Sequence, residues 1–173
     1  MFYSIKGADN MKLTKKGQPV TLPGTQPAVG DMAPDFSLAD INDKKHSVTD
    51  FLGKPTILSI IPDIDTRVCA IQTKRFNMEA SRLKDINFAT ISDNTKEEQA
   101  AWCGQEGVDM LMLHDPENTL NENYHLLINE TKHYARVIFV LDKNGVIQYR
   151  EIVPEISQEP DYAKALAAAK KLR

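Results

Sequence analysis

The chain is organised around the sequence Ile61-Pro62-Asp63-Ile64-Asp65-Thr66-Arg67-Val68-Cys69. This segment follows the apolar run Thr56–Ile61, which is typical of a central strand covered on both faces. It leads into Val68–Leu83, where apolar residues recur at helical spacing. Four residues are expected on one side of this helix: Cys69, Phe76, Ala80 and Leu83. The sequence therefore predicts a strand, a loop and a helix, with a cysteine in the first helical turn.

A cysteine at the start of a helix can become reactive. If Thr66 is the N-cap, Arg67, Val68 and Cys69 are the first three helical residues, where backbone N–H groups lack partners. Those donors and the positive end of the helix dipole stabilise a thiolate, which is the nucleophilic form. Pro62 can rigidify the loop, and the Thr66 hydroxyl can donate to the sulfur. The alternative is that Thr66 only caps the helix and Cys69 is only a buried core residue.

Strands and helices alternate through the rest of the chain. Strands are expected at Phe36–Leu38, Ile86–Ile91, Met110–Leu113, Ala135–Leu141 and Val146–Val153, with a hairpin at Met11–Leu22. Helices are expected at Asp50–Pro55, Lys96–Cys103 (ended by Gly104 and Gly107), Glu117–Tyr124 and Tyr162–Arg173. This order predicts an α/β fold with a mixed sheet flanked by helices. Residues 11–173 are expected to form a single domain, and residues 1–10 an N-terminal extension with little order.

Composition narrows the class of protein. The net charge of −3 argues against nucleic acid or an anionic membrane as a partner, and no apolar run reaches the roughly 18 residues of a membrane span. The N-terminus lacks the layout of a signal peptide, so we expect a cytoplasmic protein.

The chain contains two cysteines, and in a reducing compartment cysteines are more often catalytic or redox-active than structural. They stand 34 positions apart and no histidines cluster near them, so we expect no CxxC motif, metal site or cofactor.

A longer pattern surrounds the cysteine. The spacing Pro62-x-x-x-Thr66-x-x-Cys69 matches the peroxiredoxin active-site motif, and the chain resembles the thiol peroxidase branch, the atypical two-cysteine peroxiredoxins. Further ordered matches run through most of the chain: Gly24-Thr25, Gly30-Asp31, Ala33–Phe36, Gln72–Asn77, Cys103-Gly104 and Ala135–Asp142. The resemblance implies a thioredoxin fold with an extra N-terminal hairpin, and a homodimer.

The resemblance also implies roles for particular residues. Cys69 would be the peroxidatic cysteine, which attacks a peroxide and becomes a sulfenic acid. Pro62 would shield it, Thr66 and the Cys69 backbone N–H would hold the peroxide, and Arg136 would favour the thiolate. Cys103 would resolve the sulfenic acid as an intrachain disulfide, and thioredoxin would reduce that bond. For the disulfide to form, the first turn at Cys69 and the helix end at Cys103 are expected to unwind locally.

Several alternatives remain open at this level. The branch usually has proline where this chain has Arg67, which places a cation either near Cys69 or in solvent. Arg136 alone also fits a pair with a carboxylate at a sheet end, and Cys103 beside Trp102 also fits a buried helix residue. Three functions follow: a two-cysteine peroxidase, a one-cysteine variant resolved by an external thiol, and a redox sensor that oxidises a partner.

Overall fold

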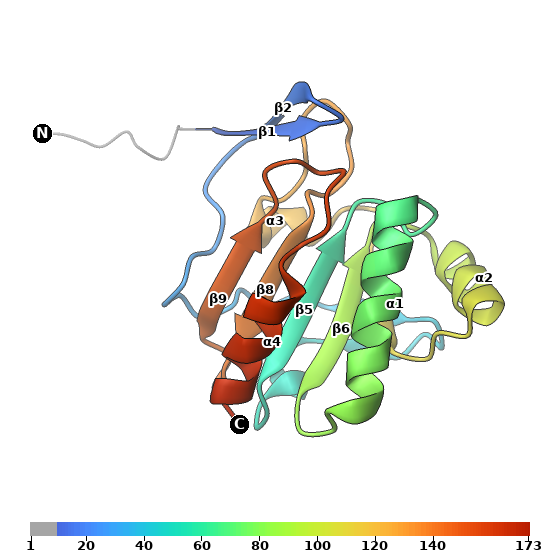
Figure 1. Ribbon diagram of the computed structural model, residues 1–173, viewed down its shortest axis with the longest axis vertical. Coiled ribbons are helices and arrows are strands. Elements are labelled where there is room, and N and C mark those ends of the chain that lie inside the picture. Colours follow the sequence, from blue (N-terminus) through green and yellow to red (C-terminus); the bar gives the residue numbers. More distant parts are fainter. Residues whose placement is uncertain (1–9) are drawn as a thin grey trace, which may run out of the picture.

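A seven-stranded mixed sheet forms the centre of the computed structural model, which describes residues 10–173 (Figure 1). The predicted extension at residues 1–10 lies outside this range except for Asn10. The sheet strands are β3 (Leu38–Asp40), β4 (Lys45–His46), β5 (Thr56–Ile61), β6 (Asn87–Ser92), β7 (Leu111–His114), β8 (Val137–Leu141) and β9 (Ile147–Ile152). Their order is β4-β3-β7-β6-β5-β8-β9. Because β6 runs parallel to β5 while β8 runs antiparallel to it, the predicted mixed sheet is confirmed.

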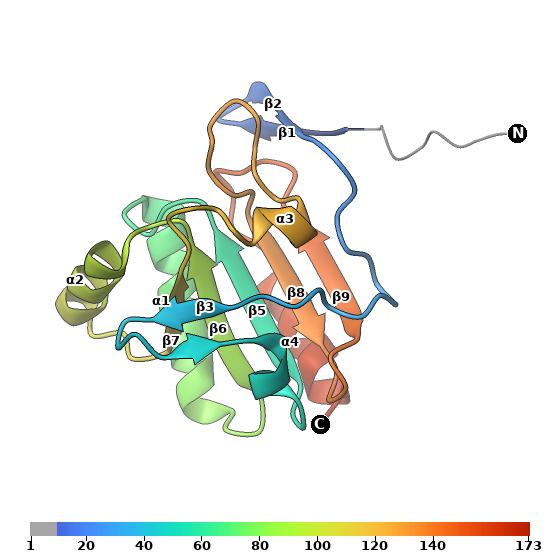
Figure 2. The same ribbon diagram turned by 180° about the vertical axis from the view of Figure 1, so that it is seen from behind.

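Helices cover both faces of this sheet. They are η2, a 3-10 helix (Val48–Phe51), α1 (Arg67–Arg82), α2 (Lys96–Glu106), α3 (Asn121–Tyr124) and α4 (Tyr162–Lys171). Helices α1 and α4 lie over one face of the sheet, and α3 lies on the other (Figures 1 and 2). The predicted hairpin is also present, as β1 (Met11–Lys15) and β2 (Gln18–Leu22), and it packs at one end of the sheet. No helix within residues 10–173 is long and apolar enough to cross a membrane.

Strand β5 is buried along its whole length, as its apolar sequence predicts. Because successive side chains of a strand point to opposite faces, Ile57 packs with Phe76 of α1, whereas Leu58 and Ile60 pack into the core on the other face. The end of β5 therefore lies deep inside the molecule, and the loop that follows it starts at a rigid position.

A third apolar cluster lies beyond the end of β5. Its members are Ile61, Ile64, Cys69, Trp102, Cys103, Val108 and Met112. The cluster joins the first turn of α1 to the last turns of α2, so both cysteines share one small core.

Some predicted boundaries differ from the structure. Helix α2 continues through Gly104 and ends only at Gly107, whose left-handed φ of 69° and N–H bond to the Cys103 carbonyl close the helix. The helix predicted at Glu117–Tyr124 starts only at Asn121, because the Asp115 carboxylate accepts from the N–H groups of Thr119 and Leu120 and so stabilises a turn there. The remaining differences are small. Leu38 begins its strand rather than ending it, and the turn expected from Asp50 forms two residues earlier.

Candidate active site

Cys69 lies where the sequence predicts, in the first turn of α1. Thr66 is the N-cap, with extended backbone angles, and Cys69 is the third helical residue. The Cys69 side chain is fully buried. Both Cys69 and Cys103 are free thiols.

Arg136 reaches Cys69 from the residue before β8. Its Nη1 lies 3.3 Å from the sulfur and 2.9 Å from Oε1 of Gln72, and its Nε donates to the carbonyl of Ile156 at 2.8 Å. None of the ion pairs found within residues 10–173 involves Arg136, which is only 2% exposed. A buried cation is costly without a negative partner. The guanidinium donates instead to the sulfur of Cys69, so any negative charge that forms on this sulfur lies beside a buried cation.

Gln72 and Ser59 are site residues that the sequence analysis missed. Both are buried, and the Gln72 side-chain amide donates to the Ser59 hydroxyl at 2.6 Å while its oxygen accepts from Arg136. Gln72 stands three positions after Cys69 and therefore on the same side of α1. The spacing from Cys69 is a signal that the sequence does contain, but glutamine does not fit an apolar side. Ala80 and Leu83, which were predicted for that side, are only half-buried.

Thr66 does not donate to the sulfur of Cys69. Its hydroxyl donates to the Asp63 carbonyl at 2.8 Å, and its side chain makes no capping bond. The first N–H groups of α1 are therefore not satisfied by this cap and remain able to bind an incoming oxygen.

A pocket of about 450 Å³ opens above this centre. Pro62, Thr66 and Arg136 line it, and so does Arg67, which is exposed to solvent and faces this pocket. Cys69 lies beneath the lining, in contact with Arg136. The structure therefore places Pro62, Thr66 and Arg136 in the wall of one pocket, with the buried Cys69 in contact with Arg136.

Glu155 fixes another wall of the pocket. Its carboxylate accepts from Thr14 Oγ1 at 2.8 Å, from the N–H of Lys16 at 3.0 Å and from the N–H of Gly17 at 2.9 Å, and also binds Ser157. These bonds, with the Ser157 hydroxyl first, hold the pKa of Glu155 well below its usual range. The carboxylate thus joins the β1–β2 turn to the segment whose Ile156 carbonyl accepts from Arg136.

Cys103 lies inside α2, three residues before its end. Its side chain is 5% exposed, and burial raises the pKa of its thiol. Its carbonyl accepts from the N–H groups of Gly107 and Val108, which hold the helix end in place. Cys103 therefore lies in an intact turn of α2, within the same apolar cluster as Cys69.

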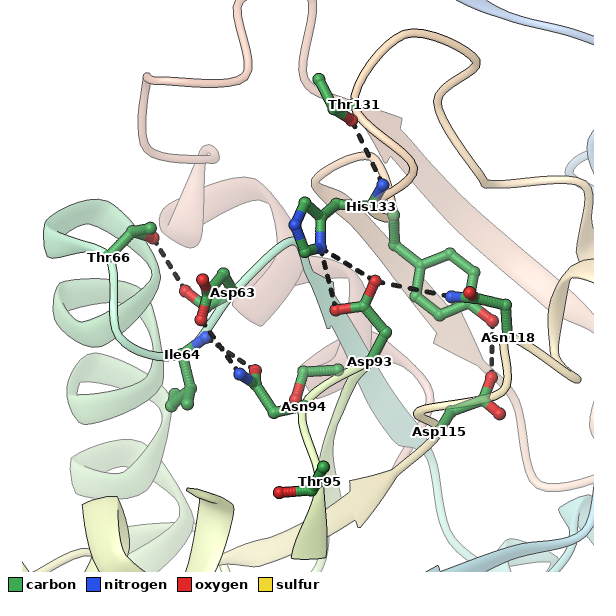
Figure 3. A network of polar contacts seen from close by, with 12 residues as sticks. Asp63, Ile64, Thr66, Asp93, Asn94, Thr95, Asp115, Asn118, Thr131 and His133 are labelled. Carbon is green, nitrogen blue, oxygen red and sulfur yellow. Dashed lines mark hydrogen bonds and ion pairs between the residues drawn. The ribbon is translucent and has the colours of Figure 1, made fainter. Parts of the chain in front are cut away.

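A network of polar side chains borders the pocket on the side of β6 (Figure 3). Nδ1 of His133 lies 3.0 and 3.2 Å from the two oxygens of Asp93. Burial raises the pKa of Asp93, although the contact with His133 opposes this change. Asn94 donates to the Asp63 carboxylate at 3.0 Å and accepts from the N–H of Ile64 at 2.9 Å, which ties the loop before Cys69 to the start of α2. Thr66 is the one labelled member of this network with a site role predicted from the sequence.

Comparison with known proteins decides the family. Residues 29–150 match the model of the AhpC/TSA family. The chain belongs to the AhpC/TSA family. Proteins named thiol peroxidase resemble it over nearly its full length. The thiol peroxidase of Bacillus subtilis (strain 168) is 45% identical over 163 residues, covering 93% of this chain and 98% of that protein. The thiol peroxidase of Streptococcus pneumoniae (strain ATCC BAA-255 / R6) is 44% identical over 162 residues, covering 92% and 99%.

Solved structures of a peroxiredoxin-like protein and of a thiol peroxidase share the fold of this chain. A peroxiredoxin-like protein from Aquifex aeolicus superposes with a TM-score of 0.87 at 28% identity, covering 94% of this chain and 97% of that one. A thiol peroxidase from Chromobacterium violaceum shows the same fold, with a TM-score of 0.83 at 15% identity over 92% and 96%. These matches confirm the thioredoxin fold and the resemblance to thiol peroxidases, and they support a thiol-dependent peroxidase.

Proposed function

We propose that this AhpC/TSA protein is a peroxidase that reduces hydrogen peroxide and organic hydroperoxides through Cys69. The observation that carries the proposal is the 3.3 Å contact between Nη1 of the buried Arg136 and the sulfur of Cys69. It provides a nucleophile whose negative charge is paired, beneath a pocket large enough for a small peroxide.

The first step forms one bond and breaks another. The Cys69 thiolate attacks the distal oxygen of the peroxide, the O–O bond breaks, and the sulfur becomes a sulfenic acid while the remaining oxygen leaves as hydroxide or alkoxide. Arg136 and the N–H groups at the start of α1 bind the peroxide oxygens during this attack. Pro62 and Thr66 border the peroxide in the same pocket.

The second step uses Cys103. Its thiol condenses with the sulfenic acid to form an intrachain disulfide and releases water, and thioredoxin then reduces the disulfide by thiol–disulfide exchange. The shared apolar cluster keeps the two segments adjacent. Local opening of the first turn of α1 and of the end of α2 brings the two sulfurs together. We also propose a cytoplasmic homodimer built from a single domain over residues 11–173, on the strength of the resemblance.

One specific observation favours a second candidate. Because Cys103 is buried within a closed helix and burial raises its pKa, an external thiol rather than Cys103 can be the group that resolves Cys69.

Mass analysis without reductant separates these candidates. After one equivalent of hydrogen peroxide, the two-cysteine mechanism predicts a peptide pair joined through Cys69 and Cys103 in most molecules. A sulfenic acid that persists at Cys69, with Cys103 still reduced, rejects it in favour of the one-cysteine mechanism. A wild-type protein that consumes no peroxide rejects both.

A further inference from the structure

A histidine–carboxylate pair lies at the rim of the peroxide pocket. His133 lines the same pocket as Arg136 and Thr66, and its side chain is 45% exposed, whereas that of Asp93 is 7% exposed. The histidine ring is therefore accessible from the pocket, and the carboxylate that holds it is not.

Contacts of the ring and of the backbone fix the orientation of His133. Nδ1 faces both oxygens of Asp93, and the backbone N–H donates to Thr131 Oγ1 at 3.2 Å. Asn118 in turn lies 3.4 Å from Asp93. A carboxylate at Nδ1 keeps a proton on that nitrogen, so Nε2 is the nitrogen that can exchange a proton with a bound molecule. Figure 3 shows Nε2 on the side of the ring that faces Asp63 and Thr66.

The proposed reaction needs a proton at this place. When the O–O bond breaks, the leaving hydroxide or alkoxide is a strong base, and a positioned acid speeds its departure. Asp93 contacts the His133 ring, and the charged residues that line the pocket with His133 are Asp63, Lys15, Lys16, Arg67 and Arg136. Arginine does not release its proton, and lysine ammonium groups are weak acids at neutral pH. Imidazole is the side chain that ordinarily changes charge near neutral pH.

We propose that His133 is a catalytic acid that protonates the leaving oxygen from Nε2, and that Asp93 is the residue that positions it. This inference rests on the proposed function. The Cys69 thiolate and the hydroperoxide give a sulfenic acid and an alkoxide, so sulfur is oxidised by two electrons and each of the two peroxide oxygens is reduced by one. The Nε2 proton of the doubly protonated His133 ring converts the alkoxide to an alcohol, which leaves the ring neutral with its remaining proton on Nδ1. Neutral His133 then takes a proton from water or from the next thiol that ionises.

A purely structural pair offers a matched control. His46 and Asp40 join β4 to β3 through a contact of 2.9 Å between Nε2 and Oδ2, and neither residue lines the pocket. Replacing His46 therefore removes a histidine–carboxylate pair without touching the proposed acid.

Peroxides with different leaving groups test the proposal. The rate of Cys69 oxidation is measured for the wild type, His133→Gln, Asp93→Asn and His46→Gln with hydrogen peroxide, tert-butyl hydroperoxide and peroxyacetic acid. Peroxyacetic acid releases acetate, a weak base that needs no proton. In His133→Gln, the rate of Cys69 oxidation should fall about 100-fold with hydrogen peroxide and tert-butyl hydroperoxide, and less than about 3-fold with peroxyacetic acid. Asp93→Asn should lower the rate with the same two peroxides, but by a smaller factor. His46→Gln should oxidise at the wild-type rate with all three peroxides.

A uniform loss with all three peroxides, or no loss with any, would overturn the role of His133. A second variant separates loss of the acid from misfolding. In His133→Gly, added imidazole should restore the rate of Cys69 oxidation by tert-butyl hydroperoxide. If the variant is folded and imidazole does not restore the rate, His133 is not the acid. The proposed function fails separately, if the wild type consumes none of the three peroxides.

Discussion

Nη1 of Arg136 lies 3.3 Å from the sulfur of Cys69, and neither side chain is more than 2% exposed. The guanidinium also binds Gln72 and the carbonyl of Ile156. The contacts with Gln72 and Ile156 hold the guanidinium against the sulfur, and in the proposed mechanism this cation stabilises the charge of the attacking thiolate.

Arg136→Lys tests this relationship. A lysine keeps the charge, but its ammonium cannot reproduce the planar set of donors that meets the sulfur, Gln72 and Ile156 together. We expect the rate of Cys69 oxidation by hydrogen peroxide to fall roughly 100-fold. Arg150→Lys is the control, because Arg150 is half-buried and binds the Pro27 carbonyl outside this site. A wild-type rate for Arg136→Lys would contradict the role given to the guanidinium.

Gln72→Leu should lower stability as well as activity. It leaves Nη1 of Arg136 with one partner fewer and removes the donor to the buried Ser59 hydroxyl. The free energy of unfolding in urea should fall by about 1–3 kcal/mol. In a double-mutant cycle with Ser59→Ala, the two losses should not add, because the residues share one hydrogen bond. Additive losses would show that the bond contributes nothing.

Glu155→Gln should have an effect that depends on pH. The pKa of Glu155 is lower in the folded protein than in the unfolded chain, so the stability that its charge contributes is present above the unfolded pKa of about 4.3 and is lost as pH falls through the folded value. The difference in urea midpoint between variant and wild type should therefore be largest near neutral pH and shrink in acid. The exposed Glu117→Gln serves as control. A difference that stays constant from neutral pH into acid would contradict this.

Two glycines in and after α2 should change the resolving step in opposite directions. Gly107 has a φ of 69°, and an added Cβ meets nothing within 4 Å, so Gly107→Ala strains only the backbone and should loosen the helix end. Gly104 lies within the helix, where alanine favours the helix by roughly 1 kcal/mol. Disulfide formation, followed by fluorescence of Trp102, should be faster in Gly107→Ala and slower in Gly104→Ala. Equal rates would mean that opening of α2 does not limit this step.

The same step should depend on pH. Because burial raises the pKa of the Cys103 thiol, less of it is thiolate at neutral pH than for an exposed cysteine. The rate of disulfide formation after oxidation of Cys69 should rise from neutral to alkaline pH. A rate that is independent of pH over this range would contradict attack by a buried thiol.

Local sequence predicted the parts of the site that depend on local structure. The apolar run of β5, the N-cap at Thr66 and the position of Cys69 follow from residues that are neighbours in the chain. Arg136 was predicted from the family motif. The end of α2 was misjudged because glycine is tolerated inside a helix that packs well, and Gly104 lies next to the buried Cys103.

The missed contacts join segments that are distant in sequence. Glu155 binds Lys16 across 139 positions, and His133 binds Asp93 across 40. No period or local motif marks such pairs, since each residue alone is an ordinary polar side chain of a loop. They are set by the way the hairpin and the loops pack around the end of the sheet.

The most direct measurement is peroxide consumption by Cys69→Ser and Cys103→Ser beside the wild type. If Cys69 is the nucleophile, Cys69→Ser consumes no peroxide, while Cys103→Ser consumes one equivalent and then stops unless an external thiol is added. If Cys69→Ser consumes peroxide at the wild-type rate, Cys69 is not the nucleophile and the account is wrong.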